Sequence, residues 1–253
     1  GTPGPAASTR HVRPGRNLPL IPPPSSSYAY LFGPVLSRRM GWSLGIDLVP
    51  HKTCSFDCPF CQVGRTTDRT TVRRDYVPVQ AVLAELADWM SQGGEADYVT
   101  LAGSGEPTLH SHFGDVLQAA RGEGRYRTAL LSNGTLLSQP DVSRDACRAD
   151  VVKASLSAWD EDSFQQVNRP HPDLSFGCVM HGLEDFRRAF HGEFWIEVFL
   201  LRGVNDAPFH VLRFAAHVGS VGPDQVQLNT VVRPPAEPAA LAVPAEEDLA
   251  EAA

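Results

Sequence analysis

Short apolar runs alternate with amphipathic stretches between residues 42 and 232, and this rhythm predicts the fold. Each run is at most eight residues long and rich in β-branched or aliphatic side chains, as in strands buried on both faces. Strands alternating with helices predict parallel βαβ units, which right-handed crossovers curl into an open or closed barrel. The predicted strands are 42–49, 98–103, 127–133, 151–157, 194–201 and 226–232.

The segments between these strands have the periodicity of helices. The clearest helix runs from about 79 to 92, with one apolar face and with Gly93-Gly94 as a left-handed stop. Further helices are predicted with a cap at Asp141, with a cap at Asp160 or Asp162, and around the apolar stripes of 176–186 and 211–215.

Both ends of the chain differ in composition from this core. Residues 1–28 are rich in Pro, Gly and Ser and are predicted to be a flexible extension, whereas 238–253 form an acidic Ala/Pro/Glu tail. The start has no continuous apolar region of the kind found in secretory signals, and no run of 18 apolar residues occurs. We therefore expect a core of 29–237, no membrane span and a cytoplasmic location.

The net charge changes sign along the chain. Overall it is −7, made of +6 over residues 1–75 and −13 over the remainder. An acidic total opposes non-specific nucleic-acid binding, which depends on neutralising phosphates. The basic N-terminal part, which includes Arg38 and Arg39, either faces an anionic substrate or serves solubility and surface ion pairing.

Three of the five cysteines lie in one loop after the first predicted strand. Cys54, Cys58 and Cys61 have the spacing C-x3-C-x2-C, and three such thiolates can hold three irons of a [4Fe–4S] cluster. One iron then has no protein ligand and is open to a cofactor. The other cysteines, Cys147 and Cys178, fall in distant helical segments and are predicted to be free, partly buried thiols.

Two other interpretations of the cysteine loop remain open at this stage. His51 could complete a four-ligand structural zinc site with the three cysteines. Alternatively, the loop could belong to an electron-transfer protein, which would need a fourth ligand to close its cluster.

The segment Cys54-x3-Cys58-x-Phe60-Cys61 resembles the signature loop of radical S-adenosylmethionine (SAM) enzymes. Together with four further sequence motifs, this segment is similar to a subgroup of Fe–S oxidoreductases. That subgroup is related to the radical SAM domain of wyosine tRNA-modifying enzymes. The resemblance covers about residues 29–237, and family members generally continue beyond that point. The motifs, the first of which contains the cysteine segment, are FGPVLSRRMGWSLGIDLVPHKTCSFDCPFCQVGRTT (32–67), AGSGEPTL (102–109), LLSNGTLL (130–137), NRPHP (168–172) and VQLNTVVRPPAE (226–237).

This resemblance implies a fold, cofactors and a set of site residues. The fold is α/β, a partial (β/α)6 TIM-like barrel of parallel strands, and the three cysteines hold a [4Fe–4S] cluster whose open iron binds SAM. Phe60 is expected near the cluster and the adenine. Gly105 and Glu106 match the family's Gly-Glu motif for the methionyl ammonium, for which a carboxylate is a suitable acceptor. A reductant such as flavodoxin or ferredoxin is implied.

Polar residues on later strands extend the predicted site. Asn133 either reaches SAM or belongs to an Asn-Gly turn. Lys153 needs an anionic partner on a buried strand, and we expect the SAM carboxylate there, with Ser155 near the ribose. Residues of the last strands either line the substrate end or make buried hydrogen bonds. His171 is either a loop residue, which we expect, or a substrate contact. These strand residues are Asn205, Asp206, Gln227, Asn229 and Arg233.

The predicted function is reductive cleavage of SAM to start radical chemistry on an unidentified substrate, which is a small molecule, a peptide or an RNA base. The alternatives are an electron-transfer protein and an enzyme that transfers the 3-amino-3-carboxypropyl group of SAM.

Overall fold

A computed structural model describes residues 28–237, and these contain one curled seven-stranded sheet. Its strand order is β1-β2-β5-β6-β7-β8-β9, and the six strands from β2 to β9 are parallel to one another. All six predicted strands are confirmed within a few residues, as is the partial barrel. The strands are β1 Leu31–Ser37, β2 Gly41–Ile46, β5 Tyr98–Leu101, β6 Arg127–Ser132, β7 Val151–Ser155, β8 Glu193–Leu200 and β9 Gln225–Thr230.

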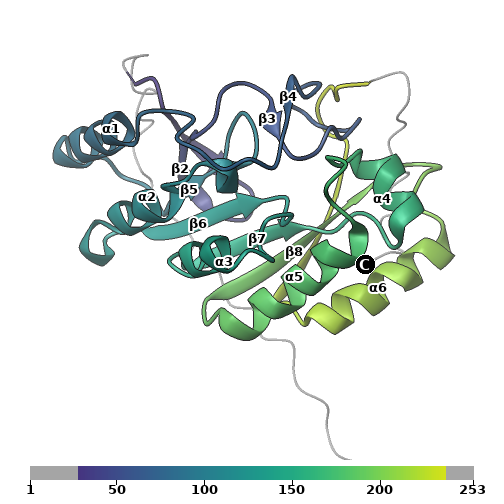
Figure 1. Ribbon diagram of the computed structural model, residues 1–253. Helices are drawn as coiled ribbons and strands as arrows, with labels where there is room; N and C mark the ends of the chain where they lie inside the picture. The colour runs from purple at the N-terminus through teal and green to yellow at the C-terminus, as the bar shows by residue number, and fades with distance from the viewer. Residues whose placement is uncertain (1–27, 238–253) are drawn as a thin grey trace, which may run out of the picture.

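Helices line the outer face of this sheet (Figure 1). They are α1 Val79–Ser91, α2 Phe113–Ala120, α3 Pro140–Ala146, α4 Glu161–Asn168, α5 Phe176–Ala189 and α6 Pro208–Val221. Asp160 caps α4, as predicted, through a capping box with Ser163. The predicted cap at Asp141 was wrong: Pro140 occupies the first helical position of α3, so Gln139 is the cap and Asp141 lies in the first turn.

The sequence patterns missed strand β1 and helix α2. Strand β1 pairs antiparallel with β2, with a shift in register between Phe32 and Val35. Pro34 in this segment argues against a strand, but proline is tolerated in an edge strand such as β1. Helix α2 is only eight residues long, and it follows a 3-10 turn at Pro107–Leu109. Its buried residues Phe113, Val116, Leu117 and Ala120 have the helical spacing that would have identified it.

Three apolar clusters are buried among the described residues, and two of them lie on opposite faces of the sheet, as side chains that alternate along a strand require. The larger cluster fills the space between the sheet and the helices and includes Leu101, Leu130 and Ile196. The smaller cluster lies inside the curl and contains Met40, Tyr98, Ala129, Val151 and Trp195. These inward residues lie toward the N-terminal ends of their strands, so the inner face is left free for polar groups toward the carboxyl ends.

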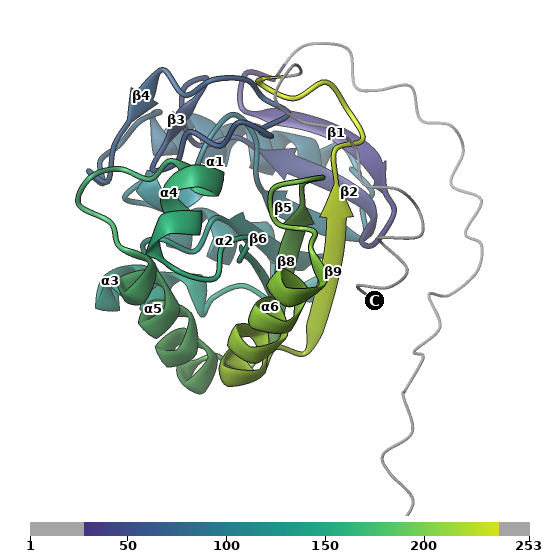
Figure 2. The same ribbon diagram turned by 90° about the vertical axis from the view of Figure 1, so that its right-hand side faces the viewer.

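The first and last strands approach each other across the opening of the barrel (Figure 2). Arg39, in the turn between β1 and β2, donates to Asn229 Oδ1 at 2.9 Å and to the Leu228 carbonyl at 3.1 Å. The predicted extension and tail lie outside the described residues, except Tyr28, whose hydroxyl donates to Asp88 of α1. Within residues 28–237, no helix combines the length and the apolar character needed to cross a membrane.

Candidate active site

A cavity of about 600 Å³ opens at the carboxyl ends of the parallel strands, where βα barrels carry their chemistry. It is lined by the cysteine loop, by the loops after β5 and β6, and by the inward side chains of β7, β8 and β9. All nine residues predicted to bind the cluster or SAM line this one cavity: Cys54, Cys58, Phe60, Cys61, Gly105, Glu106, Asn133, Lys153 and Ser155.

The cysteine loop is fixed on one side by the loop that follows β5. The Lys52 amide donates to the Ser104 carbonyl at 2.8 Å, and the Glu106 amide donates to the Thr53 carbonyl at 3.0 Å. Gly105 makes this approach possible, because a Cβ at that position would lie 1.8 Å from the Thr53 carbonyl oxygen. Gly105 therefore brings the Gly-Glu segment against the cysteine loop.

Residues far along the chain fix the other side of the loop. The His171 amide donates to the Ser55 carbonyl at 2.8 Å, which confirms His171 as a loop residue outside the cavity lining. After β9 the chain returns along the cysteine loop, where Ala236 donates to the Cys61 carbonyl (2.9 Å) and Glu237 to the Pro59 carbonyl (3.0 Å). In Figure 1 this last described segment, in yellow, rises beside β3 (Thr53–Cys54) and β4 (Asp68–Arg69).

Glu106 is almost fully buried, and its carboxylate accepts four hydrogen bonds. Oε1 accepts from the Thr108 amide (3.1 Å), the Thr108 hydroxyl (2.6 Å) and the Ser132 hydroxyl (2.8 Å), and Oε2 accepts from the Asn133 amide (2.7 Å). Burial raises the pKa of Glu106 above its ordinary value, and these hydrogen bonds partly oppose the rise. Because a carboxylate oxygen can accept more than one bond, Oε2 keeps an acceptor position for a ligand.

Each cysteine sulfur in the cavity has a nitrogen donor beside it. The pairs are Lys52 Nζ with Cys61 Sγ at 3.0 Å, Asn133 Nδ2 with Cys54 Sγ at 3.6 Å, and Asn168 Nδ2 with Cys58 Sγ at 3.6 Å. Donors of this kind stabilise thiolate sulfur in an iron–sulfur cluster, so the environment fits the cluster.

Burial alone disfavours thiolates at two of these positions. It raises the pKa of Cys54 to about 12 and raises the pKa of Cys58 further still. Bound metal reverses this preference, since iron or zinc replaces the thiol proton. However, no group of three or more His, Cys, Asp or Glu side chains in residues 28–237 could hold a metal ion, and His51 is exposed. This finding concerns a single metal ion, because the ligands of a multi-iron cluster need not converge on one ion.

Lys153 points into the barrel as predicted, but its partner is a protein carboxylate. It forms an ion pair with Glu197 of β8, and Glu197 also accepts a hydrogen bond from Asn229 of β9. The lysine therefore does not need the SAM carboxylate to balance its charge. Ser155, one step along the same face of β7, also lines the cavity.

An aromatic pair forms one wall of the cavity. Phe60 stacks on Phe199 of β8, with ring centroids 4.5 Å apart and an interplanar angle of 17°. Phe60 remains partly exposed, and both rings line the cavity. The pair therefore offers a flat apolar surface next to the cysteines.

The remaining predicted polar residues fall into two groups. Asn229 and Arg233 line the cavity. Asn205 is fully buried and bonds backbone groups at Ser157, Phe199 and Leu201, and Asp206 accepts from the Gly203 amide in a turn. Gln227 is buried, and its Nε2 has no hydrogen-bond partner among the described residues.

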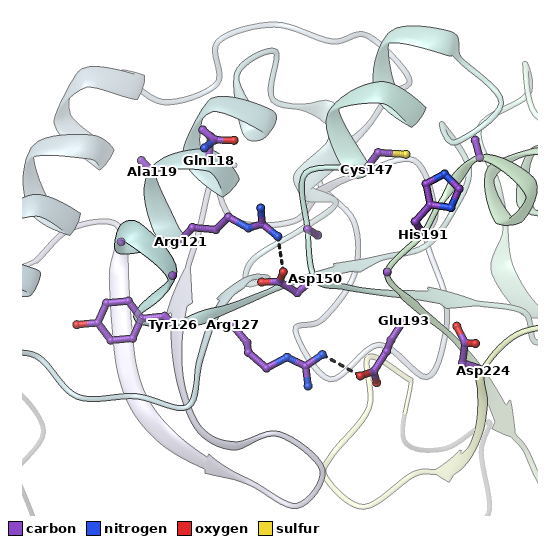
Figure 3. Close-up of a pocket in the computed structure, with 15 residues that line it drawn as sticks. Gln118, Ala119, Arg121, Tyr126, Arg127, Cys147, Asp150, His191, Glu193 and Asp224 are labelled. Carbon is purple, nitrogen blue, oxygen red and sulfur yellow. Dashed lines mark hydrogen bonds and ion pairs between the residues drawn. The ribbon is translucent and has the colours of Figure 1, made fainter.

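A second, larger hollow of about 1340 Å³ lies at the opposite, N-terminal ends of the strands (Figure 3). Its charged side chains are paired, Arg121 with Asp150, Arg127 with Glu193, and Asp224 with Arg187 outside the lining. Cys147 lies on its wall and is exposed, as is Cys178 elsewhere, so the prediction that these thiols are partly buried was wrong. Polar groups at this end of a barrel serve stability, so size alone does not identify the active site.

Several residues that shape the cavity were not predicted. Lys52 and Asn168 lie in the sequence motifs that carry the family resemblance. Glu197 is an acidic residue within the apolar run 194–201, and a charge in such a run indicates a buried partner. Glu237, which pairs with Arg65 and Arg169, lies after the last strand and gave no comparable signal.

Comparisons with known proteins agree with this geometry. The sequence model of a family described as the Radical SAM superfamily matches residues 48–215. A UPF0026 protein of Synechocystis sp. is 32% identical over 83% of this chain and 78% of its own length. A UPF0026 protein of Methanocaldococcus jannaschii is 33% identical over 81% of this chain and 64% of its own length.

A protein of Brachyspira hyodysenteriae named GTPase Obg is 38% identical over 80% of this chain, which spans only 30% of that protein. That name belongs to the longer protein, of which this chain matches less than a third. The chain thus spans less than two thirds of the length of two of these relatives.

Solved structures share the fold at low sequence identity. TYW1 with a lysine-pyruvate adduct superposes with a TM-score of 0.60 at 18% identity, over 83% of this chain and 71% of that one. A radical SAM methyltransferase from Sphaerobacter thermophilus has the same TM-score and identity, over 83% of this chain and 61% of that one. The family match and the half-barrel architecture together lead to one assignment: this chain belongs to the radical SAM superfamily.

Proposed function

We propose that this chain binds a [4Fe–4S] cluster through Cys54, Cys58 and Cys61 and uses it to cleave SAM reductively, which starts radical chemistry on a substrate. The observation that carries the proposal is the single cavity that holds the three cysteines together with the predicted SAM residues. Members of the superfamily use a [4Fe–4S] cluster and SAM, and the family implies both a reductant and a substrate. When bound, this pair supplies an electron and a cleavable C–S bond, normally yielding a 5′-deoxyadenosyl radical.

The chain's own groups have distinct tasks in this proposal. Glu106 Oε2 accepts from the methionyl ammonium of SAM, next to the Asn133 amide that it already binds. The Phe60–Phe199 pair packs against the adenine, and Ser155 contacts the ribose. The apolar cluster below the cavity, which includes Trp195 and Tyr98, keeps water from entering through the barrel.

The substrate itself is proposed only as a chemical class. The charged residues that line the cavity support an anionic substrate, because cations outnumber anions there although the chain carries a net charge of −7. The electron donor is proposed to be a small one-electron carrier such as flavodoxin or ferredoxin. The cations are Arg38, Arg39, Lys52, Lys153 and Arg233, and the anions are Glu106 and Glu197.

Anaerobic reconstitution followed by product analysis tests the proposal. On reduction with dithionite, the chain is expected to convert SAM to 5′-deoxyadenosine, detected by mass spectrometry. Methylthioadenosine as the product would indicate 3-amino-3-carboxypropyl transfer instead, and a cluster that leaves SAM intact would support an electron-transfer protein.

Two cysteine variants locate the cluster in the same experiment. Cys58→Ala is expected to lose most of the bound iron and all SAM cleavage, because a cubane held at two corners is not retained stably. Cys147→Ala, which removes an exposed thiol at the opposite end of the barrel, is the matched control. It is expected to keep the bound iron and the SAM cleavage activity. Loss of iron in Cys147→Ala, or its retention in Cys58→Ala, would contradict the ligand assignment.

A further inference from the structure

Lys52 combines three properties that ordinary loop residues do not have. Its side chain is buried, with 2% exposure, although lysine is among the residues least often buried without a partner. Its backbone has φ 58°, in the left-handed region that unbranched L-residues adopt only at a cost. Its ammonium lies 3.0 Å from Cys61 Sγ. The fold therefore holds a positive charge against one of the three sulfurs.

The backbone around Lys52 fixes this placement. Its amide donates to Ser104, and its carbonyl accepts from the amides of Thr67 (3.0 Å) and Asp68 (3.2 Å). Three backbone hydrogen bonds thus stabilise the strained conformation that directs the side chain toward Cys61.

Composition singles out the same residue. Only two of the 22 Lys and Arg residues in the chain are lysines, Lys52 and Lys153, and both line the cavity. Arginine serves at every other cationic position, and a compact ammonium differs from a guanidinium chiefly where space is limited. Lys153 is neutralised by Glu197, whereas the group to which the Lys52 ammonium donates is the Cys61 sulfur.

We propose that Lys52 is a positioning residue that sets the redox properties of the cluster through Cys61, an inference that rests on the proposed function above. Reduction adds one electron and therefore one negative charge to the cluster, and no proton moves. A fixed ammonium on a ligating sulfur stabilises the reduced form more than the oxidised form, so it raises the reduction potential. The donors at the other two sulfurs are neutral amides and have smaller effects. They are the Asn133 and Asn168 side chains, each at 3.6 Å, and the Phe56 backbone N–H, at 3.5 Å from Cys54 Sγ.

The test is a redox titration of the reconstituted protein with dithionite and mediators, followed by electron paramagnetic resonance. Lys52→Met keeps an unbranched side chain at the strained position but removes the charge. At a fixed solution potential we expect it to lower the ratio of reduced to oxidised cluster about tenfold, which for one electron is about 59 mV. Lys52→Arg keeps the charge and is expected to stay close to the wild type.

A control variant separates contact with the sulfur from the general polarity of the cavity. Lys153→Met combined with Glu197→Gln removes the other lysine together with its partner and leaves the net charge of the cavity unchanged. Its potential is expected to match the wild type. A wild-type potential in Lys52→Met, or an equal shift in the control, would overturn the inference.

The design also separates this inference from the proposed function. If the wild-type protein assembles no four-iron cluster, the proposed function fails, and the inference fails with it. If the wild type assembles the cluster but Lys52→Met does not, Lys52→Gln takes its place in the titration. If neither neutral variant holds four irons while Lys52→Arg does, Lys52 retains the cluster and does not tune it, which also overturns the inference.

Discussion

At the scale of single residues, Glu106 joins the loops after β5 and β6 through one buried carboxylate. Each of its oxygens accepts from one backbone amide, Oε1 from Thr108 and Oε2 from Asn133. Backbone amides cannot rotate to become acceptors, so the site requires two acceptor oxygens and not merely a polar side chain.

Glu106→Gln is therefore expected to lower the free energy of unfolding by about 1–3 kcal/mol, because either orientation of the new amide places its NH2 group against a backbone N–H. Denaturant unfolding of the protein without its cofactors measures the change. Glu95→Gln, at an exposed position, is the control and should change stability by less than about 0.5 kcal/mol. Equal stability of the two variants would mean that the carboxylate is not needed to hold these loops.

Gly105 gives a second test at this scale. Gly105→Ala places a methyl group against the Thr53 carbonyl and is expected to cost at least about 1–3 kcal/mol and to reduce the iron retained after reconstitution. Gly177→Ala, in a helix with no atom within 4 Å of the new Cβ, is the matched control and should be neutral or slightly stabilising. Full iron retention and an unchanged melting temperature in Gly105→Ala would show that the two loops can separate without consequence.

At the scale of elements, the starts of β6 and β7 are joined by Asp150. Its Oδ2 accepts from the Thr128 amide at 2.8 Å and from the Thr128 hydroxyl at 3.0 Å, and Oδ1 pairs with Arg121. Burial acts to raise the pKa of Asp150, but these hydrogen bonds and the arginine outweigh it and hold the pKa below its ordinary value of 3.8. The folded state therefore binds this proton less tightly than the unfolded state.

The consequence is a pH-dependent contribution to stability. With a lowered pKa, the stabilisation by Asp150 is complete above pH 3.8 and is lost as the pH falls through the lower value of the folded state. Asp150→Asn should therefore be less stable than the wild type near neutral pH, and the difference should narrow below pH 3.8. Urea unfolding at several pH values measures it, and a difference that stays constant down to the acid limit would contradict the assignment.

Sequence patterns predicted the elements best where the periodicity was strong. The parallel strands β5 to β8 are short runs of mostly apolar residues and were recovered with small errors at their ends. The edge strand β1 was missed because Gly33 and Pro34 interrupt its apolar residues, and both residue types are uncommon in strands.

At the scale of the whole molecule, the candidate site was predictable because its residues occur in short sequence motifs at the ends of strands. The barrel brings these strand ends together in one place. These motifs do not predict which distant residues pair with one another. The register of the sheet and the course of the loops decide which distant residues meet. They bring Lys153 to Glu197 and Glu237 to Arg169, and they place a side-chain nitrogen donor beside each of the three cysteine sulfurs.

The proposed function depends on a cluster held at three corners with its fourth iron open to SAM. The most direct measurement is electron–nuclear double resonance on the reduced, reconstituted chain with SAM labelled with ¹⁵N at the methionyl amine. A nitrogen coupling to the cluster is predicted, together with four irons and four sulfides per chain. Bound zinc, or a four-iron cluster that shows no coupling to labelled SAM, would contradict it.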